Sequence, residues 1–178
     1  MIVDFKQNQG DLTLYGVAQK RQVRALTSDK ALKVPAAWSP DGDSVAYFQA
    51  QGDPLHNRTE VWVVNQDGTG QKLIGRIVEM AYSYLATSIS WSPDNQRIAA
   101  ISQNDLYTWE VSTTIFLKLT QDSIVKRHPR WSPNGEYIAY LRQEKNGWGL
   151  VVFHVSSGES RYLTTASGEP PAWKPLTH

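Results

Sequence analysis

The sequence has no cysteine and no long hydrophobic run, and both absences narrow what the chain can be. Without cysteine it cannot form a disulfide scaffold, a thiolate zinc site or a cysteine nucleophile. No apolar stretch approaches the ~18 residues of a membrane span, so we expect no insertion into a membrane. The segment Met1–Lys6 lacks the basic and then apolar layout of a signal peptide. This predicts a cytoplasmic chain or one whose leader has been removed.

The chain also lacks an excess of either charge and the usual catalytic motifs. Lys and Arg number 18 and Asp and Glu number 17, so a net charge of +1 predicts no nucleic-acid partner. There is no Gly-x-Ser-x-Gly elbow and no His-x-x-x-His spacing, and Asp67–Lys72 has neither the full spacing nor the following helix of a phosphate loop. We therefore predict no catalytic residue, no metal and no cofactor.

What the sequence does contain is an internal repeat. The segment Pro35–Phe48 returns in variant form at Ser88–Ala100 and Pro129–Tyr140, and in a shortened form at Pro171–Pro175. The repeat positions are marked by four tryptophans, which we predict to be structural: Trp38, Trp91, Trp131 and Trp173. Their spacing is about 40 residues, apart from one longer interval, and this period is typical of a four-stranded propeller blade.

The residue types explain why each repeat is expected to be all-β. The tryptophan closes a short apolar strand, Ser-Pro disfavours helical continuation, and Asp-Gly or Asn-Gly supplies a tight turn. A second apolar strand follows, as in Val45–Phe48 and Tyr137–Leu141, with little polar alternation. Such runs predict strands buried on both faces.

These strands predict one β-propeller domain over residues 1–178, with antiparallel four-stranded blades at 35–76, 88–121 and 128–165. Residues 1–28 correspond to strands two to four of a repeat, and residues 170–174 correspond to strand one. A propeller must protect its first and last edges, so we expect both termini to build a fourth, closing blade. The alternative is that two chains complete each other in one eight-bladed ring.

The chain resembles the TolB-type family of WD-like propeller repeats over essentially its whole length. The resemblance rests on Trp38-Ser-Pro-Asp-Gly42, on Val64-Asn-Gln-Asp-Gly68 and on outer strands ending in Leu-Thr. It implies a bacterial periplasmic or extracellular location and a six-bladed parent, so this chain would be a smaller relative, a fragment or half of a larger ring. Many such repeats carry an aspartate near the positions of Lys33 and Lys126, where this chain is basic.

The two longest loops predict the binding side, because both are expected to emerge at the end of the blades opposite the Ser-Pro turns. The candidate partner-binding residues at this rim are His56, Asn57, Arg58, Tyr82, Tyr84, Lys126, Arg127, His128 and Trp148. Structural alternatives exist for each group. The tyrosines could fill the space between blades, residues 126–128 could be a solvated charge run, and Trp148 could be a hairpin tip folded onto its sheet.

The sequence therefore predicts a non-catalytic propeller that binds a protein partner through this loop-rich rim. One alternative is a carbohydrate-binding or hydrolytic propeller that uses its central funnel. Exposed aromatic residues beside two convergent carboxylates would favour that alternative. Another is a structural fragment of a larger propeller protein.

Overall fold

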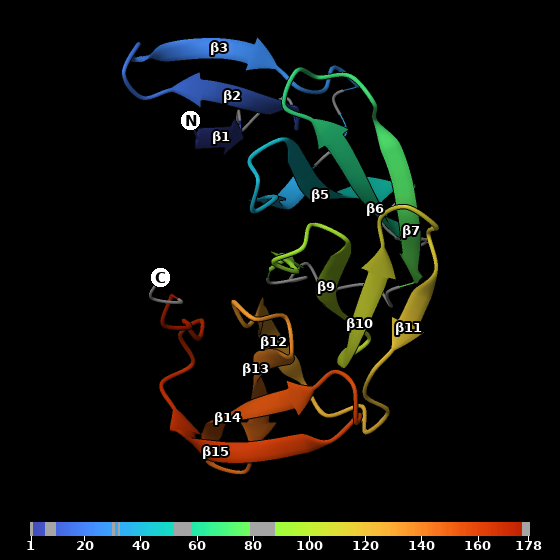
Figure 1. The fold of residues 1–178 in the computed structure, drawn as a ribbon, viewed down its shortest axis with the longest axis vertical. Coiled ribbons are helices and arrows are strands. Elements are labelled where there is room, and N and C mark those ends of the chain that lie inside the picture. Colours follow the sequence, from blue (N-terminus) through green and yellow to red (C-terminus); the bar gives the residue numbers. More distant parts are fainter. Residues whose placement is uncertain are drawn as a thin grey trace. The chain divides into compact units, whose positions relative to one another are not determined.

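The computed structural model describes residues 2–5, 10–29, 31, 33–51, 58–78 and 88–175. All regular structure in these residues is β-strand, and the strands are labelled in Figure 1. The described residues include no helix that is long and apolar enough to cross a membrane. The chain divides into two compact units, Met1–Ala81 and Tyr82–His178, and each is described by itself.

The first unit contains two antiparallel sheets. One has three strands in the order β1-β2-β3, with bounds Ile2–Phe5, Leu12–Gly16 and Arg21–Ala25. The other has four strands in the order β4-β5-β6-β7, with bounds Lys33–Trp38, Ser44–Gln51, Arg58–Asn65 and Lys72–Val78. Each strand pairs with its neighbour in sequence, as expected of a propeller blade.

The second unit contains two four-stranded antiparallel sheets. The first consists of β8 to β11, with bounds Ser90–Trp91, Arg97–Ser102, Asp105–Glu110 and Phe116–Lys118. The second consists of β12 to β15, with bounds Lys126–Trp131, Tyr137–Glu144, Gly147–His154 and Ser160–Ala166.

The predicted all-β architecture of four-stranded antiparallel sheets is confirmed for the three complete repeats. The first sheet has three described strands, as expected for residues 1–28. The C-terminal segment 171–175 has no strand assignment, and the tryptophan within it, Trp173, donates its indole N–H to the carbonyl of Arg130 at 2.9 Å. Closure by the termini and the number of blades stay predictions.

The Ser-Pro turns are built by the same hydrogen bonds in each complete repeat. The Ser39 hydroxyl donates to the Asp41 carboxylate and accepts from the backbone N–H of Ser44. The equivalent bonds join Ser92 to Asp94 and Arg97, and Ser132 to Asn134 and Tyr137. These polar residues therefore close a turn between two strands.

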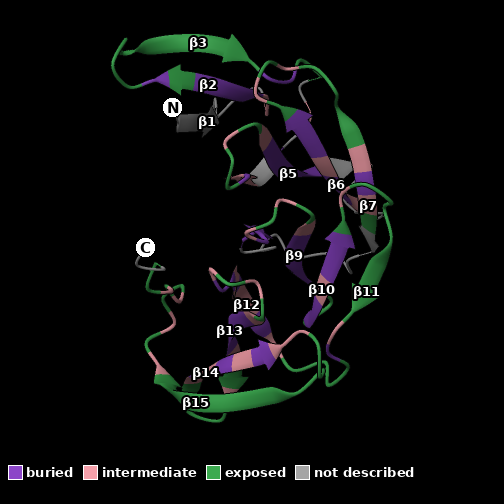
Figure 2. Ribbon diagram, in the orientation of Figure 1, coloured by how far each residue is buried: buried purple, intermediate pink, exposed green. Residues whose placement is uncertain are grey.

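Each unit buries a core between the faces of its two sheets. In the first unit, residues of β2 pack against β5 and β6, including Leu12, Leu14, Val45, Tyr47 and Val64. In the second unit, Leu106 and Ile101 pack against Ile138, Tyr140 and Phe153. Figure 2 shows β9 and β10 as largely buried and β11, the outer strand of the same sheet, as exposed. The outer strands β3 and β15 of two other sheets are exposed as well. The cores therefore lie among the middle strands.

Candidate functional site

A buried charge network joins the two sheets of the second unit. Asp105 begins β10, Thr120 follows β11, and Lys126 begins β12 of the next sheet. The Thr120 hydroxyl donates to Asp105 Oδ1 at 2.9 Å and accepts from the backbone N–H of Leu106 at 2.9 Å. Lys126 Nζ lies 3.4 Å from Asp105 Oδ1 and also pairs with Asp122, and the Lys126 side chain is completely buried. We call this Asp-Thr-Lys set a clamp.

The first unit contains a second clamp of the same design. Thr27 donates to Asp11 and accepts from the backbone N–H of Leu12, and Lys33 pairs with Asp11 and Asp29. Lys33 Nζ donates to the carbonyl of Ala31, as Lys126 Nζ does to that of Ile124. Both clamps follow one sequence pattern, Thr-x-Asp-x-x-x-Lys, at residues 27–33 and 120–126. A repeated network at equivalent positions indicates a structural role.

The clamp aspartates stay ionised because their partners outweigh burial. Burial raises the pKa of Asp105. The hydrogen bonds from Lys118 and Thr120 and the charge of Lys126 together lower this pKa by more than burial raises it, so it lies below its usual value. The pKa of Asp122 is lowered in the same way, with burial opposed first by the hydrogen bond from Lys126. A buried charge is tolerated only when it is paired, and here both signs are present.

The clamp corrects the sequence prediction for Lys126. This residue was expected on the loop-rich rim beside Arg127 and His128, but its charged head is enclosed by two carboxylates and two carbonyls. It is therefore not available to a partner. The alternative of a solvated charge run also fails for Lys126. The sequence signal that reveals its role is the repeated spacing from Thr120 and Asp122, which matches that of Lys33.

Arg127 and Trp148 are brought together at one end of the last sheet. The Arg127 guanidinium lies 4.8 Å from the centre of the Trp148 ring, and both side chains are partly exposed. On β13 of the same sheet, Arg142 pairs with Glu144 at 2.8 Å. This ion pair raises the pKa of Arg142, first through its hydrogen bond to Glu144. A guanidinium over an indole ring is a cation–π contact that holds both side chains in place.

The remaining rim residues are placed only in part. His56, Asn57, Tyr82 and Tyr84 lie outside the described residues, so their membership of the rim stays a prediction. Arg58 begins β6, where its backbone pairs with Gln51 and Val78. His128 lies in β12 with a φ of 55°, at the register shift between Arg127 and Arg130. Sequence reasoning missed the Arg142–Glu144 pair, although its two-residue spacing in a strand predicts that both side chains share a face.

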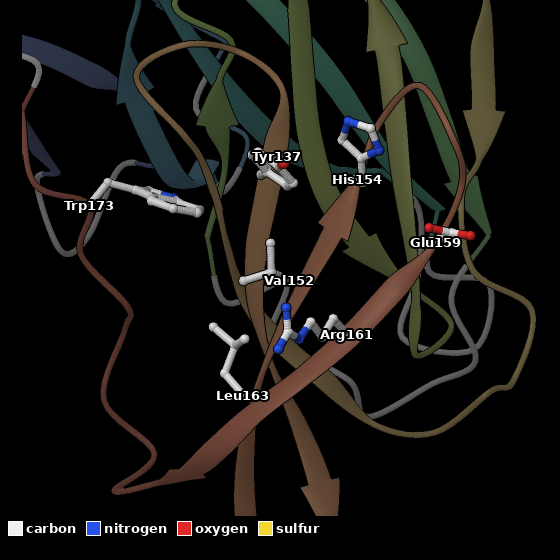
Figure 3. Close-up of a pocket in the computed structure, with 7 residues that line it drawn as sticks. All are labelled: Tyr137, Val152, His154, Glu159, Arg161, Leu163 and Trp173. Atoms are coloured by element: carbon white, nitrogen blue, oxygen red, sulfur yellow. The ribbon is translucent and has the colours of Figure 1, made fainter.

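Each of the four repeat tryptophans is buried or contacts a neighbouring part of its own unit. Trp91 and Trp131 are buried, and the Arg97 guanidinium lies 4.7 Å from the centre of the Trp131 ring. Trp38 packs beside the core of the first unit. Trp173 forms a wall of the cavity shown in Figure 3. These positions agree with a packing role for the repeat motif.

The cavity in Figure 3 has a volume of about 420 Å³ and lies over β13, β14 and β15. Its lining includes Tyr137, Val152, His154 and Leu163, and Glu159 is its one carboxylate. The described residues contain no group of three or more His, Cys, Asp or Glu side chains that could hold a metal ion. The cavity therefore offers an apolar surface with a polar edge.

Comparison with known proteins agrees with this architecture. The sequence profile of the family described as "TolB beta propeller domain" matches residues 1–177. The chain belongs to this family. A curated relative, Tol-Pal system protein TolB 1 of Novosphingobium aromaticivorans, is 36% identical over 63 residues, which is 34% of this chain and 14% of that protein. The TolB-type repeat predicted from the Trp-Ser-Pro motif is therefore confirmed.

Two solved structures have a fold similar to that of this chain. TolB from Acinetobacter baumannii matches with a TM-score of 0.71 and 17% identity, covering 89% of this chain and 39% of that one. Dipeptidyl peptidase 4 from Porphyromonas gingivalis matches with a TM-score of 0.58 and 12% identity, covering 91% of this chain and 31% of that one. These identities establish the fold alone. The chain spans 14% of the curated relative and well under half of each of the two solved chains.

Proposed function

We propose that this chain is a non-catalytic β-propeller scaffold that binds a protein partner at the end of the last sheet where Arg127 and Trp148 meet. The single observation that carries this proposal is the partly exposed Arg127–Trp148 pair, 4.8 Å from guanidinium to ring centre. Tryptophan and arginine dominate the binding energy of protein interfaces. Because the pair is held by a mutual contact, less conformational entropy is lost when a partner binds.

The charged and hydroxyl groups described above make structural contacts, which supports a scaffold rather than an enzyme. Asp105, Asp122 and Lys126 are used in a clamp, and the Ser132 hydroxyl closes a turn. The alternative of a carbohydrate-binding or hydrolytic propeller would need two convergent carboxylates beside an aromatic platform. The cavity beside Trp173 provides one, Glu159. The observations therefore favour binding.

The family resemblance supports two finer proposals. The compartment is the bacterial periplasm or the cell exterior, which the similarity to a Tol-Pal system protein supports. The fold is a ring in which residues 171–173 add a fourth strand to the sheet β1-β2-β3, from the same chain or from another. The three-stranded first sheet supports this proposal.

The binding proposal is tested by capture of partners from a periplasmic extract on the immobilised chain, followed by titration of each captured protein after purification. Trp148→Ala and Arg127→Ala are each expected to weaken binding about tenfold or more, because truncating an interface hot spot costs roughly 2 kcal/mol. The matched control is Phe116→Ala, which removes a 60% exposed ring from the outer strand β11. This control is expected to leave binding unchanged.

Circular dichroism and thermal unfolding of each variant separate lost binding from lost structure. Capture of every partner at wild-type strength by both Trp148→Ala and Arg127→Ala would remove this end of the sheet as the binding site. Turnover of a peptide or glycoside by the purified chain, abolished by Glu159→Gln, would overturn the non-catalytic assignment.

A further inference from the structure

Four glycines of the chain follow an aspartate or an asparagine, and the same side reaction is chemically open at each pair. The preceding residues are Asp41, Asp67, Asn134 and Asn146. The backbone nitrogen of the glycine can attack the side-chain carbonyl carbon of the residue before it and close a five-membered succinimide ring. Glycine favours this closure because it has no side chain to crowd the approach. In a folded chain the ring forms only where the side chain and the nitrogen can reach attack geometry.

Both aspartates of this set are held in turns. The Asp41 carboxylate accepts hydrogen bonds from the Ser39 hydroxyl and from the backbone N–H of Asp43. The Asp67 carboxylate accepts hydrogen bonds from the backbone N–H and the hydroxyl of Thr69. These bonds direct each carboxylate to the residue two positions along the chain, and not to the nitrogen of its glycine.

Asn134 is held as well, and it is the matched comparison for Asn146 because both precede glycine. Its Oδ1 accepts from the Ser132 hydroxyl at 2.6 Å and from the backbone N–H of Glu136 at 3.2 Å, and its Nδ2 donates to Glu136 Oε2 at 2.6 Å. The nitrogen that would attack, that of Gly135, donates to the carbonyl of Ser132 at 3.0 Å. A Cβ atom at Gly135 would lie 3.3 Å from the Pro93 side chain, so the site is also crowded.

Asn146 lies in the two-residue tip of the hairpin between β13 and β14, and its surroundings differ. Its side chain is exposed and forms no hydrogen bond to any residue that the structure describes. A Cβ atom at Gly147 would meet nothing within 4 Å, so the space beside the attacking nitrogen is open. Exposed loop tips also open locally at little cost in free energy. The fold therefore protects Asn134 and leaves Asn146 reactive.

A carboxylate at position 146 would lie close to the pair formed by Arg127 and Trp148. Residues 146 and 148 are two positions apart, and their Cα atoms are separated by at most about 7 Å. The Arg127 guanidinium lies 4.8 Å from the centre of the Trp148 ring. Among the described residues, no carboxylate pairs with this guanidinium. A new negative charge at the tip is therefore near enough to attract it.

We propose that Asn146 is a self-modification site, at which the exposed hairpin tip converts the asparagine to aspartate or isoaspartate and places a carboxylate beside Arg127. The Gly147 backbone nitrogen loses its proton to hydroxide and forms a bond to Asn146 Cγ. The bond between Cγ and Nδ2 breaks, and Nδ2 takes up a proton from water and leaves as ammonia. Water then opens the ring and returns a proton to the Gly147 nitrogen. Attack of water at Cγ gives aspartate, and attack at the backbone carbonyl carbon gives isoaspartate.

The conversion is expected to weaken the partner-binding end of the last sheet, a consequence that rests on the proposed function. The carboxylate competes with a partner for the hydrogen-bond donors of Arg127. Isoaspartate also adds one methylene to the main chain just before Gly147, which displaces the start of β14 and with it Trp148. Because neither product returns to asparagine, the binding surface would change in one direction as the chain ages.

The test follows the full folded chain by peptide mass spectrometry during incubation at mildly alkaline pH. Trypsin places the two asparagines in separate peptides, 131–142 and 146–161, with one asparagine in each. The mass increase of an amide-to-acid conversion is expected in peptide 146–161 at least about tenfold faster than in peptide 131–142, since the bonds that hold Asn134 must break first. In concentrated urea both peptides are expected to convert at similar rates, because each contains the same Asn-Gly pair.

Two variants separate the chemistry from its consequence. Asn146→Gln keeps an amide at the tip but would need a less favourable six-membered ring, so its peptide is expected to stay unconverted. Asn146→Asp carries the product charge from the start. It is expected to shift the Trp148 indole N–H signal in an NMR spectrum, assigned by its loss in Trp148→Phe, and Asn146→Gln is expected to leave that signal in place. Asn146→Asp is also expected to bind each purified captured protein at least about twofold more weakly than Asn146→Gln.

Three results overturn the inference. One is a folded chain in which Asn134 and Asn146 convert at the same rate. Another is a folded chain that keeps Asn146 intact while the urea-unfolded chain converts it. The third is an Asn146→Asp variant with an unshifted Trp148 indole signal, which would remove the effect on the pair. Failure of the wild-type chain to capture any protein would contradict the proposed function alone, because the mass measurement needs no partner.

Discussion

Lys126 Nζ lies 3.4 Å from Asp105 Oδ1, and both side chains are completely buried although they come from different sheets. Lys126 begins β12, and Asp105 begins β10 of the preceding sheet. The ion pair therefore joins one repeat to the next through buried charges.

Lys126→Met is expected to destabilise the chain by about 3 kcal/mol, because it removes the buried cation that Asp105 and Asp122 share and leaves Asp105 paired with the partly exposed Lys118 alone. Urea unfolding followed by tryptophan fluorescence measures this change. The control is Lys145→Met, at the exposed tip of the β13–β14 hairpin, which is expected to change stability by less than about 0.5 kcal/mol. Adding Asp105→Asn to Lys126→Met is expected to restore part of the loss. Equal stability of Lys126→Met and wild type would contradict the clamp.

The clamps also predict how stability depends on pH. The pKa values of Asp29, Asp105 and Asp122 are lowered in the folded chain from the usual 3.8. Their stabilisation is therefore fully present above the unfolded pKa and is lost as pH falls through the lower folded values. Urea midpoints are expected to be constant from neutral pH to about pH 5 and to fall below about pH 4. A shallower fall in the Asp105→Asn, Lys126→Met double variant would assign the effect to the clamp.

Thr120→Val is expected to cost about 1–3 kcal/mol, because it leaves the buried backbone N–H of Leu106 without its acceptor. Thr27→Val removes the equivalent acceptor of Leu12 and is expected to cost a similar amount. Thr165→Val is the control, since Thr165 lies exposed on β15. Thermal unfolding compares the three variants. A neutral Thr120→Val would show that water replaces the hydroxyl.

The geometry of the Ser-Pro turns predicts the order of stability of two variants at Gly42. Its φ is +79° and a Cβ atom would meet nothing within 4 Å, so Gly42→Ala costs only the backbone strain of about 1–2 kcal/mol. Gly42→Asn is expected to cost less, because Asn95 adopts a φ of 61° at the same place in its own turn. Chemical unfolding of both variants checks the order. Gly42→Asn less stable than Gly42→Ala would contradict it.

The fold could be predicted from the sequence because the residues that define each repeat form their hydrogen bonds with residues close to them in the chain. Ser39 and Asp41 close their turn within a few residues, and the strands on either side pair with their sequence neighbours. Trp38 and its counterparts mark each repeat. Such short-range rules are readable without knowing which segments meet in space.

The candidate site was predicted less well because its contacts are long-range. Lys126 looks like part of a basic surface run with Arg127, and only the approach of Asp105, on another sheet, shows that its head is buried. The contact between Arg127 and Trp148 likewise depends on two strands meeting at one end of a sheet. The repeated Thr-x-Asp-x-x-x-Lys pattern was the available signal for the clamp, and it requires comparing two repeats rather than scanning one.

Each clamp lies wholly inside its own compact unit. The first unit contains Asp11, Thr27 and Lys33, and the second contains Asp105, Thr120 and Lys126. Dividing the gene between codons 81 and 82 would therefore give two polypeptides, each retaining a complete ionic lock. Each half would therefore carry the buried ion pair that joins its own two sheets or repeats.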